Sequence, residues 1–149
     1  STPWMEAVLN GPLPECMVLM LQKEAAERYA ATHGTKNFGA ISIFLQSTFI
    51  IKARHHVSAA CFCPVPKVDS TLLWLERKPD GQTFSQSARE CVRRIFTQRR
   101  KQLGALCRKD AAPEAGVWFN QLVEQAVSAK ARPEEVPLEH WQALAKAMS

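Results

Sequence analysis

The sequence lacks long apolar runs, paired CxxC motifs and low-complexity tracts. Its longest apolar segments, such as residues 41–45 and 49–51, are far shorter than the roughly 20 residues that a membrane-spanning helix requires. The five cysteines contain no two CxxC pairs, and their odd number does not suit a disulfide framework. These absences predict a protein without membrane spans, with reduced thiols and a cytoplasmic location.

The start of the chain lacks both an initiating Met and the basic-then-apolar pattern of a signal peptide. We therefore expect the 149 residues to be a fragment of a longer protein. Hydrophobic residues make up 46% and charged residues 22%, which is typical of a globular chain. The net charge of +5 favours a polyanionic partner.

The first half of the chain alternates between predicted helices and predicted strands, which indicates an α/β fold. Helices are expected over residues 3–9, over residues 23–31 and from near Phe38. The continuous apolar run at 17–21 predicts a strand that is buried on both faces, as in a parallel sheet. Residues 49–57 and 68–77 predict two more strands, which we expect to form an antiparallel hairpin.

A turn-rich segment at residues 78–82 separates these elements from a second half in which every segment is predicted to be helical. Ser87 and Glu90 have the spacing of a capping box, and Pro137 is expected at the start of the last helix. We therefore predict an α/β part at residues 1–79 and a small all-helical domain at residues 80–149.

An aromatic residue precedes two closely spaced prolines in the loop between the hairpin strands. Phe62 is followed by Pro64 and Pro66, whose rings fix their own φ angles and restrict the residues before them. A ring on such a stiff loop can stack on a nucleobase that has been taken out of its own stack. From the residues alone, a core Phe beside a proline turn is the simpler alternative.

A second candidate is a strongly basic segment at residues 85–109, which contains eight Lys or Arg residues and a single acid, Glu90. Clustered cations neutralise phosphates and release counterions, so such a segment can dock a protein on folded RNA. Taken alone, the pattern also fits a solvated helix face. The predicted phosphate-contacting residues are Arg93, Arg94, Arg99, Arg100 and Lys101, together with Lys67 of the loop.

A metal site is not expected. Cys61 and Cys63 lie near His55 and His56 in the sequence, but a single CxC lacks the second pair of ligands of a structural zinc site.

Four segments together resemble the small-subunit ribosomal RNA adenine dimethyltransferases of the KsgA type. Residues 62–70 resemble that family's F-x-P-x-P-K-V-D-S motif, and residues 20–24 resemble M-x-Q-K-E. Residues 38–46 and 96–101 resemble Y-G-x-L-S…Q and F-x-Q-R-R-K in the same order and at similar spacing. The resemblance covers nearly the whole chain and is strongest over residues 17–103.

The resemblance implies the second half of a class I, Rossmann-like methyltransferase sheet followed by a helical RNA-binding domain. The family transfers methyl groups from S-adenosylmethionine to the exocyclic amines of two adjacent adenines in 16S ribosomal RNA, in the immature 30S subunit. This chain begins after the position of the family's N-L-P-Y motif and lacks its glycine-rich cofactor loop. We therefore expect the fragment alone to bind no S-adenosylmethionine and to be inactive.

By the same resemblance, Phe62 would stack on the target adenine, and Pro64 and Pro66 would shape its loop. Residues 67–70 would attach that loop to the following strand. Two alternatives remain, namely the related methyltransferases of large-subunit ribosomal RNA and a non-catalytic nucleic-acid-binding relative such as a transcription factor.

Overall fold

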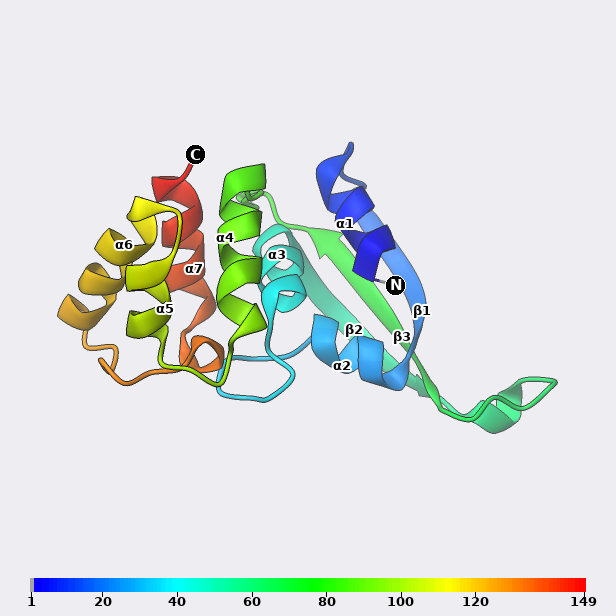
Figure 1. Cartoon of the computed structure of the whole chain (residues 1–149). Coiled ribbons are helices and arrows are strands. Elements are labelled where there is room, and N and C mark those ends of the chain that lie inside the picture. Colours follow the sequence, from blue (N-terminus) through cyan, green and yellow to red (C-terminus); the bar gives the residue numbers. More distant parts are fainter. Residues whose placement is uncertain (1) are drawn as a thin grey trace.

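The computed structural model describes residues 2–149, whose strands form one three-stranded sheet (Figure 1). Strand β3 (Ser70–Arg77) lies between β1 (Cys16–Gln22) and β2 (Phe49–Val57), and it pairs with both in the antiparallel sense. The predicted hairpin of the second and third strands is therefore confirmed. Its ladder contains one irregularity, between Ile51 and Ala53.

Helices flank the sheet on one side and then continue as a separate group (Figure 1). The first group is α1 (Thr2–Asn10), α2 (Lys23–Tyr29) and α3 (Ala40–Thr48). The second group follows the sheet in sequence and, with the short 3₁₀ turn η2 (Pro133–Glu135), consists of α4 (Gln86–Thr97), α5 (Leu103–Lys109), α6 (Pro113–Glu124) and α7 (Leu138–Ala147). The expected all-helical character of the second half is confirmed.

Strand β1 differs from its prediction. Met17 is buried, but Val18 and Met20 are 67% and 53% exposed, so only one face of the strand is covered in the described chain. β1 also lies at an edge of the sheet, and its pairing with β3 is antiparallel rather than parallel. The prediction of a parallel strand buried on both faces was wrong, because a continuous apolar run does not report which face of a strand is covered.

A continuous core joins the α/β part to the helices. Leu73 and Leu75 of β3 are fully buried and belong to the same cluster as Trp118 of α6 and Trp141 of α7. The two tryptophan rings lie 4.8 Å apart between centroids, and Phe96 of α4 lies 5.2 Å from Trp141. The predicted boundary at residues 79 and 80 therefore crosses a shared core, and the division into two domains stays a prediction.

The first turn of α4 is capped by a residue other than the predicted one. The Ser85 hydroxyl accepts a hydrogen bond from the backbone N–H of Ala88 at 3.2 Å, whereas Ser87 lies inside the helix. The prediction of a capping box at Ser87 and Glu90 was therefore wrong by two residues. Only Ser87 has a Glu three residues later, so the capping-box pattern favoured Ser87, although a serine hydroxyl can cap a helix without that Glu.

Across residues 2–149, each helix is too short or too polar to span a lipid bilayer.

An ion pair joins α4 to the turn between α5 and α6. The guanidinium of Arg94 donates to both carboxylate oxygens of Asp110, at 3.0 and 2.9 Å, and the backbone N–H of Ala112 donates to the same carboxylate at 2.9 Å. The Asp110 side chain is only 5% exposed. The hydrogen bonds from Arg94 are the main cause that lowers the pKa of Asp110 below its usual range, although burial opposes them.

The Asp110 carboxylate should make folding more stable at neutral pH than at acid pH. Because its pKa is lower in the folded state, this stabilisation is present above the unfolded value of about 3.9 and is lost as the pH falls through the folded value. We expect Asp110→Asn to lower the free energy of unfolding at neutral pH by about 1–3 kcal/mol, and by much less at about pH 2–3. Urea denaturation at both pH values measures this difference.

The matched control is Asp80→Asn in the exposed turn after β3. An Asp110→Asn variant that is destabilised equally at both pH values would contradict the assignment of the effect to the ionised carboxylate.

Candidate nucleic-acid interface

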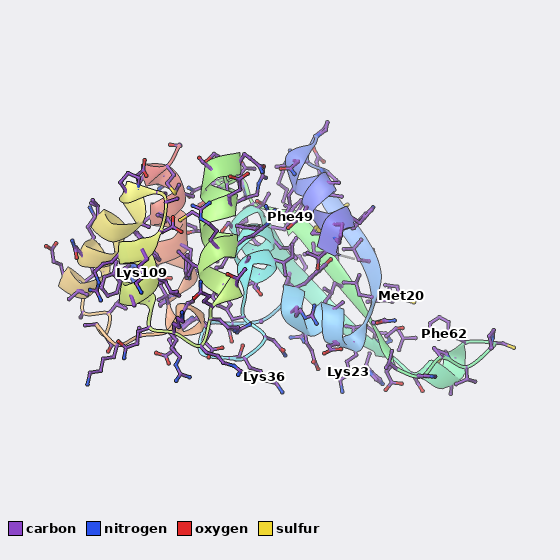
Figure 2. All side chains as sticks on the ribbon, in the orientation of Figure 1. Met20, Lys23, Lys36, Phe49, Phe62 and Lys109 are labelled. Atoms are coloured by element: carbon purple, nitrogen blue, oxygen red, sulfur yellow. The ribbon has the colours of Figure 1, made fainter. Side chains whose placement is uncertain are left out.

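The β2–β3 hairpin extends beyond the helices as a narrow arm (Figure 1). Its ladder continues to the pair Val57 and Ser70, and residues 58–69 form the tip. The short 3₁₀ turn η1 (Ala59–Cys61) begins the tip, and Phe62 follows it directly. The arm therefore holds Phe62 away from the main core (Figure 2).

The Phe62 ring is only partly buried and does not belong to the hydrophobic core cluster. Its backbone N–H donates to the carbonyl of Ala59 at 3.2 Å, which fixes the residue to the end of η1. Pro64 and Pro66 follow in the same loop and are exposed. A partly exposed ring with a fixed backbone can offer a face to a planar ligand such as a nucleobase.

Lys67 lies on the arm close to the start of α2. It is exposed, and with Lys23 and Val68 it lines a recess of about 490 Å³ at the base of the arm. Figure 2 places Lys23 between the arm and Lys36, on the same edge of the molecule. Lys67 is therefore the predicted cation that lies in the same tip loop as Phe62.

Three of the five predicted cations of α4 and its extension form ion pairs within the protein. Arg94 binds Asp110 as described above, and Arg93 binds Glu6 of α1 with an N–O distance of 2.8 Å. Arg99 donates to Glu134 at 2.6 Å and to the carbonyl of Phe38 at 2.8 Å. Arg93 connects α4 to α1, Arg94 connects α4 to the turn before α6, and Arg99, just after α4, contacts the loop before α3 and η2. The sequence did not reveal these structural contacts.

Arg100 and Lys101 differ from these three. Both side chains are exposed, and neither forms an ion pair within residues 2–149. They lie in the turn between α4 and α5, where the backbone N–H of Lys101 donates to the carbonyl of Gln98 at 2.9 Å. They are thus the predicted cations of this segment whose charge is most available to a phosphate.

The arm and the basic turn are separated in the fold. Figure 1 places α2 and α3 between the arm and α4, so Phe62 and the pair Arg100 and Lys101 lie on different parts of the surface. The structure does not gather them into one pocket. An interface that used both would need a ligand long enough to reach from the arm to the helical group.

Two other motif residues have structural contacts. The Gln46 amide of α3 donates to the carbonyls of Tyr29 and Ala31, both at 2.8 Å, and the Ser42 hydroxyl accepts from the backbone N–H of Gly39 at 3.2 Å. The segment at 38–46 therefore fixes α3 to the end of α2.

Cys61 and Cys63 are exposed in the tip loop. In the described part of the chain, His, Cys, Asp and Glu side chains form no group of three or more that could hold a metal ion.

The sequence resemblance implied that residues 67–70 attach the tip loop to the following strand, but it did not identify the contact that closes the loop at its base. The Asp69 carboxylate accepts a hydrogen bond from the backbone N–H of Ala59 at 2.9 Å, ten residues earlier in the chain. The available signal was that Asp69 is the only acidic residue of the tip loop at 58–69. That signal does not identify a backbone donor as its partner.

Comparisons of the sequence with known proteins find relatives that are named as ribosomal RNA methyltransferases or dimethylases. The model of the ribosomal RNA adenine dimethylase family matches residues 1–146. A ribosomal RNA small subunit methyltransferase A of Opitutus terrae is 50% identical over 145 residues, which cover 97% of this chain and 52% of the relative. The protein of the same name from Geobacter metallireducens is 38% identical over 156 residues, which cover 99% of this chain and 56% of the relative. The chain thus spans about half the length of these curated relatives.

Two solved structures have a similar fold. A dimethyladenosine transferase from Plasmodium falciparum superposes with a TM-score of 0.81 at 23% identity, covering 99% of this chain and 62% of that one. The 23S rRNA methyltransferase ErmE gives a TM-score of 0.64 at 21% identity, covering 97% and 59%. These likenesses place the strands and helices in the second part of an α/β methyltransferase fold with a helical extension. With the match of the family model over residues 1–146, they show that the chain belongs to the ribosomal RNA adenine dimethylase family.

Proposed function

We propose that this chain is the RNA-holding part of an enzyme that dimethylates the exocyclic amines of two adjacent adenines in small-subunit (16S) ribosomal RNA during ribosome biogenesis in the cytoplasm. The observation that carries the proposal is the position of Phe62. An aromatic ring that is partly exposed at the end of an arm has little value for core packing, but it can hold a base that has left its stack.

The choice of the small subunit rests on the curated relatives. The relatives from Opitutus terrae and Geobacter metallireducens are both named for the small subunit. We therefore favour the small-subunit substrate over the large-subunit one.

In the proposed reaction, Phe62 stacks on the target adenine while Pro64 and Pro66 limit the conformations of the loop. Stacking on an aromatic side chain contributes about 1–3 kcal/mol per base. This contribution positions the amine and does not create a covalent intermediate, so the chemical role of the arm is orientation.

The methyl donor of the whole enzyme would be S-adenosylmethionine. In doubly wound folds such a cofactor lies beyond the carboxyl ends of parallel strands, next to a glycine-rich turn. In the described chain, β1 instead passes directly into α2 at Gln22 and Lys23, and the strands pair only in the antiparallel sense. These residues therefore do not fit the cofactor.

Of the predicted cations in the basic segment, RNA docking would use the two that form no ion pair, Arg100 and Lys101, together with Lys67 in the loop of the adenine-stacking ring. Arg93, Arg94 and Arg99 would contribute only the N–H groups that their partners leave unused, because each already neutralises an acid. The partner would be ribosomal RNA of the immature 30S subunit, which is long enough to contact both the arm and the basic turn.

Removal of the charges of Arg100 and Lys101 should weaken RNA binding in a salt-dependent way. We expect the double variant Arg100→Gln and Lys101→Gln to reduce the slope of log K against log salt by about 1.4–1.8, since each phosphate contact contributes about 0.7–0.9. Fluorescence anisotropy with small-subunit ribosomal RNA, between about 50 and about 200 mM salt, measures the slope.

The matched control for this variant is Lys78→Gln with Lys146→Gln, which removes the same charge from two positions outside the basic segment at residues 85–109. An equal loss of slope in both double variants would show that only net charge matters and would contradict a docking role for the turn.

The stacking role of Phe62 predicts a spectroscopic signal. When 2-aminopurine replaces an adenine in a single-stranded RNA, stacking on Phe62 should quench its fluorescence, and Phe62→Ala should abolish the quenching and weaken binding by about 5- to 150-fold. Phe62→Trp should retain most of the quenching because it keeps an aromatic face. Val65→Ala in the same exposed loop is the control, and no quenching with the unmodified chain would disprove the stacking role.

A further inference from the structure

The base of the arm is closed by hydrogen bonds that meet at Asp69. One carboxylate oxygen accepts from the backbone N–H of Ala59 at 2.9 Å, and the other lies 3.4 Å from Nε2 of His56. The backbone carbonyl of Asp69 accepts from the N–H of Lys23 at 2.9 Å. One residue therefore connects both sides of the tip loop to the first residue of α2.

The connection continues from Asp69 to Phe62. Ala59 is the first residue of η1, and its carbonyl accepts the N–H of Phe62 at 3.2 Å. The Ser58 hydroxyl caps the same turn by accepting from the N–H of Ala60 at 3.2 Å. Hydrogen bonds thus run from α2 through Asp69 and Ala59 to the backbone of Phe62.

The hydrogen bond from Ala59 to the Asp69 carboxylate is the strongest of these hydrogen bonds. A hydrogen bond from a backbone N–H to an ionised acceptor is roughly twice as strong as one between neutral groups. The His56 contact adds little, because that side chain is 60% exposed and the pair is surrounded by solvent. The bond from Ala59 to Asp69 also shortens the part of the loop that is free to move, since it joins residues ten apart in sequence.

The other residues of the tip loop make few contacts that could fix its position. Residues 63–68 are all exposed and contribute no side chain to the hydrophobic core cluster. The two prolines restrict their own φ angles, but they do not fix the direction of the loop as a whole. The orientation of Phe62 relative to the sheet therefore depends on the closure at the base.

We propose that Asp69 is a positioning residue for the adenine-stacking ring. It does not touch the base, but its carboxylate holds η1 in the orientation that points Phe62 at the nucleotide. The inference rests on the proposed stacking role of Phe62 and adds the residue that makes this role possible.

The test compares Asp69→Ala, which removes the acceptor, with Asp69→Asn, which keeps a carbonyl oxygen for Ala59 but loses the charge. Both are measured in the whole chain by quenching of 2-aminopurine in single-stranded RNA and by amide hydrogen exchange of Ala59 and Phe62. We expect Asp69→Ala to weaken the quenching interaction and to accelerate exchange, each by about tenfold, since a hydrogen bond to a charged group contributes on that scale. Asp69→Asn should recover a substantial part of both signals.

Asp80→Asn and Asp80→Ala provide the matched controls, because Asp80 is an exposed acid in a turn outside the arm. Arg100→Gln gives a second comparison, since it should weaken RNA binding without changing amide exchange in the tip. If Asp69→Ala does not fold, as judged by circular dichroism, the Asp69→Asn variant decides the question through the same two signals.

The outcomes separate the inference from the proposed function. If the unmodified chain quenches 2-aminopurine and the Asp69→Ala variant quenches it equally, the positioning role of Asp69 is overturned. The stacking role of Phe62 would then remain intact. Absence of quenching in the unmodified chain would overturn both. Equal loss in the Asn and Ala variants would show that the acceptor oxygen for Ala59 is not the cause.

Discussion

Strand β3 is hydrogen-bonded along both edges, and this pairing holds the sheet together and directs the arm. Its partners run antiparallel to it, and Leu73 and Leu75 turn their side chains to the helices and are fully buried. The same strand leaves the covered part of the sheet with β2 and becomes one side of the arm. One strand therefore contributes to the core and also supports the loop that carries Phe62. This shared strand gives the tip loop a defined direction relative to the sheet.

The helical pattern and the hairpin could be predicted from the sequence because each depends on local periodicity. The apolar stripe of α4 and the turn residues around the arm each fall within a few positions, so the windows that reveal them are short. The environment of β1 could not be predicted in the same way. Whether Val18 and Met20 face other side chains or solvent depends on which elements lie beside the strand, and a run of apolar residues is compatible with either case.

The arginines show a second limit of sequence reasoning. Residues 93 to 101 have the pattern of a phosphate-binding surface, but the partners of Arg93, Arg94 and Arg99 lie 87, 16 and 35 positions away along the chain. Only the fold reveals that these charges are already compensated. Arg93 joins α4 to α1 of the α/β part, Arg94 joins α4 to the turn between α5 and α6, and Arg99, just after the helix, binds Glu134 and the carbonyl of Phe38. In the proposed function, the unpaired residues Arg100 and Lys101 are the ones that contact RNA.

We propose that Phe62 presents an adenine to the methylating site of the whole enzyme. The most direct measurement is methyl transfer by a chimera in which this chain replaces the matching segment of the Opitutus terrae relative, assayed on immature small ribosomal subunits. We predict that the chimera is active, that Phe62→Ala lowers its kcat/KM by about tenfold or more, and that Val65→Ala has little effect. Full activity of the Phe62→Ala chimera would contradict the account.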